Sequence, residues 1–229
     1  MALVISKKYK YIFFHLPKNA GVSISNALIN EEYSLILKKL SSYILRQILG
    51  KKNNFYFSLK NKEIFFFNSH ISCYNFYEKF NRNDFNSFYK FAVIRNPWDR
   101  MVSRYFYSKK ISKKFNNYTF EEFIDYDINL NSRVLNQFEF CTKDKDNFCL
   151  DDIIRFENIN DDFAKVTNKI FNNNRKLKHL NISKHGTYKD YYNDKLKDKI
   201  YNNFKKDINF FKYEFWKNLF EIFKKIMLN

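Results

Sequence analysis

The sequence contains very few residues with special backbone behaviour. It has three glycines and two prolines among 229 residues, so we expect each of them to stand where local geometry requires it. Gly50 follows an apolar stretch and is typical of an ordinary helix end. The others fall in three short polar segments, with Pro17 and Gly21 in the first, Pro97 in the second and Gly186 in the third. These segments are therefore the first places to look for a functional site.

Thiols and long apolar runs are also scarce. Cys73, Cys141 and Cys149 form no Cys-x-x-Cys pair and cannot all pair with one another, so we predict neither a disulfide framework nor a metal site. The apolar runs, such as 64–67, are far shorter than the roughly 20 residues of a membrane helix. The first residues do not resemble a signal peptide. We expect a cytoplasmic protein in a reducing compartment, without a transmembrane segment.

Acidic residues are outnumbered by basic ones, 24 to 41, which gives a formal net charge of +17. A charge of this size favours anionic partners. Nucleic acid, anionic lipid, acidic glycan and phosphorylated nucleotide all fit, and a compositional drift toward lysine is an equally good explanation for most of the charge. The charge predicts the sign of a partner and does not identify it.

Short apolar runs alternate with helical patterns along the chain. The run 11–16 predicts a strand that leads through a loop into a helix, and the runs 63–68 and 89–94 predict buried parallel strands. A fourth strand is predicted at 152–156, and helices at 97–109, at 160–171 and from about 194 onward. Thr119 and Glu122 form a capping-box pattern, which predicts another helix start. We predict one domain over residues 1–229 of the α/β class. Its central parallel sheet should be of the P-loop NTPase kind, flanked by helices, with a helical C-terminal part.

The first polar segment, HLPKNAGVSIS at 15–25, joins a strand end to a helix start. Helix N-termini present free N–H groups to anions, Lys18 adds a positive charge, and Ser23 and Ser25 add hydroxyl donors. The order differs from a Walker A loop, because Lys18 precedes the glycine. The segment predicts a phosphate cradle without ATP hydrolysis; the alternative is a plain turn with a solvated lysine.

The second polar segment, RNPWDRMVS at 95–103, also lies between a strand and a helix. The planar guanidinium group of Arg95 can bind a phosphate through two hydrogen bonds, and the Ser103 hydroxyl can donate another. Asn96 and Pro97 are typical of a helix start. The alternative for Arg95 is an ordinary salt bridge at a strand end. Two anion segments in this order favour the first interpretation.

The two segments together resemble the nucleotide-binding motifs of the sulfotransferases that use 3′-phosphoadenosine-5′-phosphosulfate (PAPS). The similarity is to the family that includes heparan sulfate 2-O-sulfotransferase, and it extends from about residue 10 to residue 215. It implies that the 5′-phosphosulfate is held by Lys18, Asn19, Ala20, Gly21, Val22 and Ser23, and the 3′-phosphate by Arg95 and Ser103. Val22 stands where the family usually has threonine.

Sulfuryl transfer is an in-line displacement that needs a cation at the departing oxygen and a base for the acceptor hydroxyl. Lys18 is the predicted cation. His70 follows the run 63–68 at its carboxyl end and is the predicted base, with Glu78 as the second candidate. A structural histidine bonded to a loop carbonyl is the alternative for His70.

Further segments resemble the family less specifically. Gln137, with the asparagine before it, is expected near the acceptor. The stretch HLNISKHGTYKDYYND resembles a loop that covers the nucleotide, which implies contacts from Lys184, Gly186 and Tyr188.

The resulting prediction is an enzyme that transfers sulfate from PAPS to a hydroxyl and releases 3′-phosphoadenosine-5′-phosphate (PAP), with no metal. The acceptor is expected to be a saccharide, in a polysaccharide, an oligosaccharide or a glycolipid, and peripheral contact with an anionic membrane is compatible with the charge. One alternative is a P-loop-like nucleotide kinase, for which no metal-positioning acid is evident. The other is a basic nucleic-acid-binding protein, for which no binding motif is found.

Overall fold

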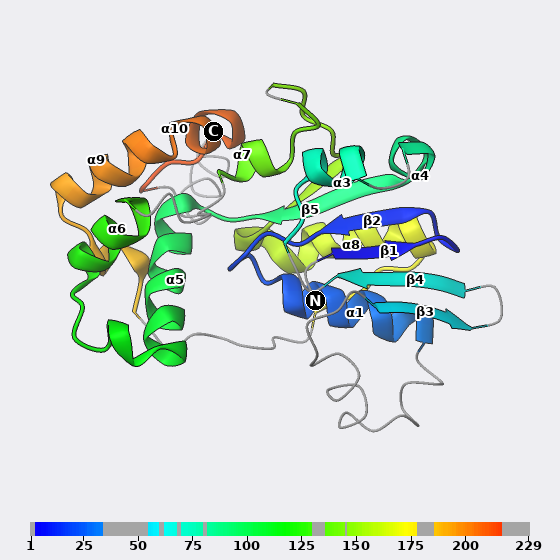
Figure 1. The fold of residues 1–229 in the computed structure, drawn as a ribbon, viewed down its shortest axis with the longest axis horizontal. Helices are drawn as coiled ribbons and strands as arrows, with labels where there is room; N and C mark the ends of the chain where they lie inside the picture. Colours follow the sequence, from blue (N-terminus) through cyan, green and yellow to red (C-terminus); the bar gives the residue numbers. More distant parts are fainter. Residues whose placement is uncertain are drawn as a thin grey trace, which may run out of the picture. The chain divides into compact units, whose positions relative to one another are not determined.

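The computed structural model describes residues 3–33, 55–59, 62–67, 70–79, 82–129, 136–144, 146–177 and 186–216 (Figure 1). The chain divides into two compact units, each formed by two stretches of sequence. The first, here called the sheet unit, comprises Met1–Ile94 and Glu139–Asn181. The second, the helical unit, comprises Arg95–Phe138 and Ile182–Asn229. The predicted single domain over 1–229 stays a prediction, and the predicted helix end at Gly50 lies outside the described residues.

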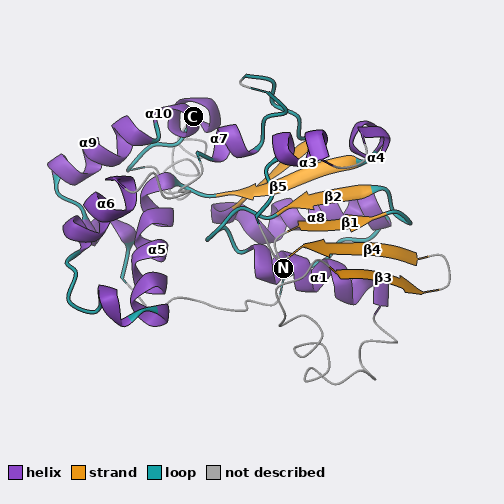
Figure 2. Cartoon of the chain, in the orientation of Figure 1, coloured by secondary structure: helices purple, strands orange, loops and turns teal. Residues whose placement is uncertain are grey.

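A six-stranded mixed sheet forms the centre of the sheet unit and is drawn in orange in Figure 2. Its strand order is β3-β4-β1-β2-β5-β6. The strands are β1 (Leu3–Ser6), β2 (Tyr11–Phe14), β3 (Phe55–Leu59), β4 (Lys62–Phe67), β5 (Tyr89–Ile94) and β6 (Asp152–Arg155). β2, β5 and β6 run parallel, whereas β1 is antiparallel to both β2 and β4, and β3 is antiparallel to β4.

The prediction of a parallel sheet is wrong for the pairing of the strand at 63–68, because β4 runs in the same direction as β2, β5 and β6 but both of its neighbours, β1 and β3, are antiparallel to it. A continuous apolar run indicates burial on both faces of a sheet but does not show which strands lie beside it. The reversal comes from β1, which turns back into β2 at residues 7–10 and pairs antiparallel with β4 on its other edge. The strands predicted at 11–16, 89–94 and 152–156 are confirmed as the parallel part.

Helices cover the two faces of this sheet. The side chains of Phe13 and Phe91 share a core with α1 (Gly21–Tyr33) and α8 (Ile159–Phe171). Phe14, one residue along β2, faces the other way and contacts the rings of Phe76 and Phe85. Those rings belong to α3 (Cys73–Lys79) and α4 (Arg82–Ser87), so alternate residues of one strand anchor two helical layers.

The helical unit confirms the predicted helix starts. In α5 (Pro97–Ile111), the Asn96 side chain accepts a bond from the Trp98 amide at 3.0 Å, and Pro97 is the first residue of the helix. In α6 (Phe120–Asn129), Thr119 and Glu122 form the reciprocal bonds of a capping box at 3.2 and 2.7 Å. The expected helical C-terminal part is present as α9 (Asp194–Asn203) and α10 (Lys205–Phe211).

Candidate functional site

The loop after β2 has an unusual backbone that a buried amide side chain holds in place. Lys18 and Ala20 have φ angles of 67° and 56°, in the left-handed region that residues other than glycine seldom adopt. Between them, Asn19 is fully buried, and its Nδ2 donates to the Val93 carbonyl of β5 at 2.7 Å. This bond ties the loop to the neighbouring parallel strand, so Lys18 is carried on a backbone that the core determines.

The same loop leads directly into α1. The amides of Ser23 and Ile24 both donate to the Ala20 carbonyl, at 2.9 and 3.2 Å. The N–H groups of Gly21 and Val22 precede this first hydrogen-bonded turn, where helix geometry directs such groups outward along the axis. The positive end of the helix dipole is therefore next to Lys18, and the combination is suited to an anion.

Gly21 is required by a close approach rather than by its backbone angles. A Cβ atom at this position would lie 1.8 Å from Cδ2 of His15 and 2.2 Å from two other ring atoms. The His15 ring is buried and stacks over Phe13 with a centroid distance of 6.2 Å. The first residue of the helix therefore packs against the first residue of the loop, and only glycine fits there.

His70 contacts this loop. Its Nδ1 lies 2.7 Å from the carbonyl oxygen of His15, and the two rings meet edge to face at 4.9 Å. Because a carbonyl only accepts, Nδ1 must carry a proton, and in the neutral ring the lone pair is then on Nε2. The rest of the His70 side chain is exposed, which is suited to a proton acceptor. The carbonyl contact predicted under the structural alternative is thus present, and it is compatible with a role as base.

Glu78, the second candidate for the base, has a different environment. Its carboxylate pairs with Arg82 at 3.6 Å on the surface of α3 and α4, and its side chain is 42% exposed. An exposed ion pair of this kind is an ordinary surface contact.

The second anion segment lies in the helical unit and is also braced. Arg95 and Ser103 are both buried, at 6% and 5% exposure, with Ser103 on α5. The Arg95 Nε donates to Asp99 at 2.8 Å, so the strand-end salt bridge considered as an alternative does exist. It fixes the plane of the guanidinium group, and a fixed plane is what bidentate anion binding requires.

Gln137 holds the backbone of Arg95 on both sides. Its Oε1 accepts from the Arg95 amide at 2.9 Å, and its Nε2 donates to the Arg95 carbonyl at 2.8 Å. The amides of Gln137 and Phe138 in turn donate to the two oxygens of Asp207, each at 2.8 Å. All of these polar groups are buried, so the network specifies the position of Arg95.

Asp207 and Arg100 are also buried charged groups of the helical unit. Burial raises the pKa of Asp207 to about 6, although the hydrogen bonds that its carboxylate accepts from the backbone amides of Phe138 and Gln137 act in the opposite direction. Burial likewise lowers the pKa of Arg100 to about 10. Sequence reasoning missed Asp207 because an aspartate inside a basic amphipathic helix resembles a solvated surface residue.

We predict that Gln137→Ala lowers the free energy of unfolding by about 3 kcal/mol, because it leaves a buried amide and a buried carbonyl of Arg95 without partners. Denaturant titration measures this loss. The exposed neighbour Glu139 on the same short helix α7 (Gln137–Phe140) provides the control, since Glu139→Gln should change stability by less than about 0.5 kcal/mol. Equal stability of the two variants would show that the Gln137 contacts do not brace Arg95.

The third polar segment is only partly described. Lys184 lies outside the described residues, and Gly186 is exposed. Tyr188 begins the short helix η3 (Tyr188–Tyr191), and its hydroxyl donates to the Phe215 carbonyl. Tyr188 therefore fastens the segment before α9 to the segment after α10, and the predicted nucleotide contacts of the three residues stay predictions.

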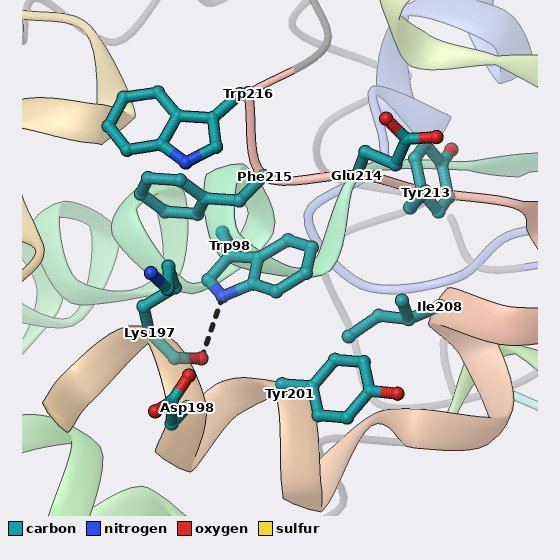
Figure 3. Close-up of a pocket in the computed structure, with 9 residues that line it drawn as sticks. All are labelled: Trp98, Lys197, Asp198, Tyr201, Ile208, Tyr213, Glu214, Phe215 and Trp216. Atoms are coloured by element: carbon teal, nitrogen blue, oxygen red, sulfur yellow. Dashed lines mark hydrogen bonds between the residues drawn. The ribbon is translucent and has the colours of Figure 1, made fainter. Parts of the chain in front are cut away.

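A cavity of about 370 Å³ lies within the helical unit, between α5, α9, α10 and the segment that follows α10 (Figure 3). Trp98, Lys197, Asp198, Tyr201, Ile208, Tyr213, Glu214, Phe215 and Trp216 line it. The Trp98 Nε1 donates to the Lys197 carbonyl at 3.0 Å, which fixes the indole. Trp98 is buried, and its ring meets that of Phe215 edge to face.

Comparison with known proteins connects these observations. The model of the sulfotransferase family, of the family 2 type, matches residues 1–214 and so includes both braced anion segments. The chain belongs to the sulfotransferase family. The family predicted from the two motifs is confirmed, and sulfuryl transfer is the general activity of its members.

Other comparisons add little about this sulfotransferase. An uncharacterized protein of Archaeoglobus fulgidus is 35% identical over 88 residues, which span 38% of this chain and 70% of that protein. No solved structure matches the chain significantly. Within the described parts of the chain, no group of histidine, cysteine or acidic side chains has the arrangement of a metal site. None of the described helices is both long and apolar enough to cross a bilayer.

Proposed function

We propose that this sulfotransferase moves a sulfuryl group from PAPS to a hydroxyl of a saccharide. The observation that carries the proposal is the loop of Lys18, which Asn19 fixes to β5 and which opens into the N-terminus of α1. A positive side chain, outward N–H groups and the helix dipole converge there on a site that suits the 5′-phosphosulfate. The family of the chain supplies the chemistry that the loop would serve.

Lys18 would stabilise the departing oxygen. As the bond from sulfur to the bridging oxygen breaks, negative charge accumulates on the phosphate of PAP. An ammonium group held close to that oxygen stabilises the transition state more than the ground state, which is the condition for raising turnover. Because the loop is fixed before the reaction, little reorganisation accompanies the charge movement.

Arg95 and Ser103 would bind the 3′-phosphate. The Arg95 guanidinium is oriented by Asp99, and its backbone is held by Gln137. A planar guanidinium group in a fixed orientation can donate two parallel hydrogen bonds to two oxygens of a phosphate, and the Ser103 hydroxyl supplies another donor. Two separate anion sites would explain a preference for a nucleotide with both a 3′- and a 5′-phosphate.

His70 would accept the proton of the attacking hydroxyl. The bond from Nδ1 to the His15 carbonyl orients the ring and leaves the lone pair of the neutral form on Nε2. The proton of the acceptor passes to Nε2 as the oxygen attacks sulfur, and the resulting imidazolium keeps its bond to His15. The basic composition of the chain suits an acceptor that is anionic.

Two substitutions of His70 separate its chemistry from its structure. We expect His70→Asn and His70→Ala both to lower kcat by about 10²–10⁴-fold, since neither side chain accepts the proton. His70→Asn keeps a donor for the His15 carbonyl, so its affinity for PAP, measured by calorimetry, should equal that of the unmodified protein. Undiminished turnover in His70→Asn would place the base elsewhere, with Glu78 tested next.

The proposed reaction is tested with radiolabelled PAPS and a panel of glycans, glycolipids and simple alcohols. Transfer of label to a saccharide supports the proposal, and transfer only to non-sugar hydroxyls would correct the acceptor. Binding is measured in parallel by thermal shift. PAP should raise the melting temperature, whereas ATP with magnesium or an oligonucleotide should not. The opposite pattern would favour the kinase or the nucleic-acid-binding alternative.

A further inference from the structure

A carboxylate from a distant helix holds the start of α7. The first two residues of α7, Gln137 and Phe138, donate their backbone amides to the two oxygens of Asp207, each at 2.8 Å. Asp207 lies on α10 and is fully buried, as is Gln137. The first amides of a helix have no acceptor within the helix itself, so this carboxylate fixes the place where α7 begins.

Gln137 connects this fixed point to Arg95. The Gln137 Oε1 accepts from the Arg95 amide at 2.9 Å, and its Nε2 donates to the Arg95 carbonyl at 2.8 Å. An amide side chain that meets a donor with its oxygen and an acceptor with its nitrogen fits in one orientation only. The backbone of Arg95 therefore has a fixed place relative to Gln137, and Gln137 has a fixed place relative to Asp207.

The guanidinium group of Arg95 is under two restraints. Asp99 accepts from its Nε at 2.8 Å and sets the plane of the group. Because Asp99 is only four residues along the chain, this bond does not tie Arg95 to another element of the unit. Gln137 and Asp207, from α7 and α10, supply that tie through the Arg95 backbone.

The charge of Asp207 suits it to accept two amides. Burial raises the pKa of Asp207 to about 6, and the positive charge of Arg100 acts in the opposite direction, as do the two amide bonds. The group is therefore ionised at neutral pH, with two oxygens that are both acceptors. An asparagine would have nearly the same size but only one such oxygen, so one of the two amides would face an NH2 group.

We propose that Asp207 is a positioning residue that determines the selectivity of this sulfotransferase for nucleotides with a 3′-phosphate. The inference rests on the proposed binding of that phosphate by Arg95. Two parallel hydrogen bonds to a phosphate are strongest when the guanidinium group is in place before the ligand arrives. Loosening the start of α7 would loosen Arg95, whereas the Lys18 loop has its own anchor in the bond from Asn19 to Val93.

The test compares two ligands that differ in one group. PAP and adenosine 5′-phosphate share the base, the ribose and the 5′-phosphate, and only PAP carries the 3′-phosphate. Calorimetry at neutral pH should show that Asp207→Asn raises the Kd for PAP by about tenfold, the effect of weakening a charged hydrogen bond, and the Kd for adenosine 5′-phosphate by less than about twofold. Equal losses for the two ligands, or no loss for PAP, would overturn the proposal.

Steady-state kinetics with PAPS give a readout that a general structural role would not change. Asp207→Asn should raise the KM for PAPS about tenfold and leave kcat within about twofold, because Lys18 and His70 keep their places. A variant that is merely less well folded would lose kcat in proportion to its inactive fraction and keep its KM. A lower kcat with an unchanged KM would therefore contradict the proposal.

Two control variants separate this inference from the proposed function. Asp198→Asn makes the same change at an exposed aspartate of α9 and should leave both affinities unchanged. Arg95→Ala should abolish the preference for PAP over adenosine 5′-phosphate. If it does not, Arg95 does not bind the 3′-phosphate, and the proposed role and the inference both fail. If it does while Asp207→Asn keeps the full preference, only the inference fails.

A further variant covers the case in which Asp207→Asn does not fold, which circular dichroism establishes. Gln137→Met nearly preserves the size of the side chain and removes both bonds to the Arg95 backbone. The same loss of preference for PAP is expected in this variant, because the tie between α7 and Arg95 is broken. An unchanged preference in folded Gln137→Met would equally contradict the proposal.

Discussion

Lys18→Asn is expected to lower the kcat for sulfuryl transfer by about 10³-fold. This is the usual effect of removing one positively charged hydrogen-bond donor that stabilises the negative charge of a transition state. Asparagine is the informative replacement because it tolerates the left-handed backbone that Lys18 adopts, at a φ of 67°. Single-turnover kinetics with PAPS measure the chemical step directly. The substitution thus removes the ammonium group and keeps the loop.

Two further variants complete the Lys18 experiment. Lys18→Ala should lose the same activity and also some stability, since alanine is strained at positive φ. Lys8→Ala removes an exposed lysine of the same unit and should leave turnover unchanged. A Lys18→Asn variant with full activity would show that the ammonium group of Lys18 does not act on the leaving group.

Gly21→Ala is expected to lower the free energy of unfolding by about 3 kcal/mol, at the upper end of what overpacking usually costs. The added Cβ would lie 1.8 Å from the His15 ring, and that ring cannot swing away because it is buried and packed on Phe13. Denaturant unfolding followed by circular dichroism measures the loss. PAP affinity should fall as well, because the helix start and the loop would have to separate.

Gly186 provides a matched control for Gly21. An alanine Cβ there would come no closer than 3.0 Å to the exposed Asp190 carboxylate, so Gly186→Ala should change stability by less than about 0.5 kcal/mol. The double variant His15→Ala/Gly21→Ala should be less destabilised than the sum of the two single variants, because the truncated ring makes room. Strict additivity would mean that the His15 contact is not the reason for glycine.

The sequence predicts the parts of the fold whose signals are local. The helix that starts with Asn96 and Pro97, and the capping box of Thr119 and Glu122, depend on side chains that contact their own backbone, and both are confirmed. The strand at 63–68 was recognised but not its pairing, because its neighbour β1 is a four-residue strand too short to show a periodicity. Local chemistry is readable in sequence, whereas pairing between distant strands is not.

In the candidate site, too, the sequence reveals individual residues but not the contacts between distant residues that hold them in place. Lys18, His70 and Arg95 could be selected because each follows the end of a strand, and Lys18 and Arg95 also stand near one of the scarce prolines. The contacts that fix them, from Asn19 to Val93 and from Gln137 to Arg95, join residues 74 and 42 positions apart. No spacing rule connects such pairs.

The buried Asn19 also bears on how the donor would associate with the enzyme. Since a bond to the core holds the two left-handed residues around Asn19, the loop has its shape before any anion arrives. A preorganised loop loses little conformational entropy when it receives a ligand. Binding of PAP should therefore be a fast, single-step association at this loop, with a favourable enthalpy that is not offset by the ordering of a flexible segment.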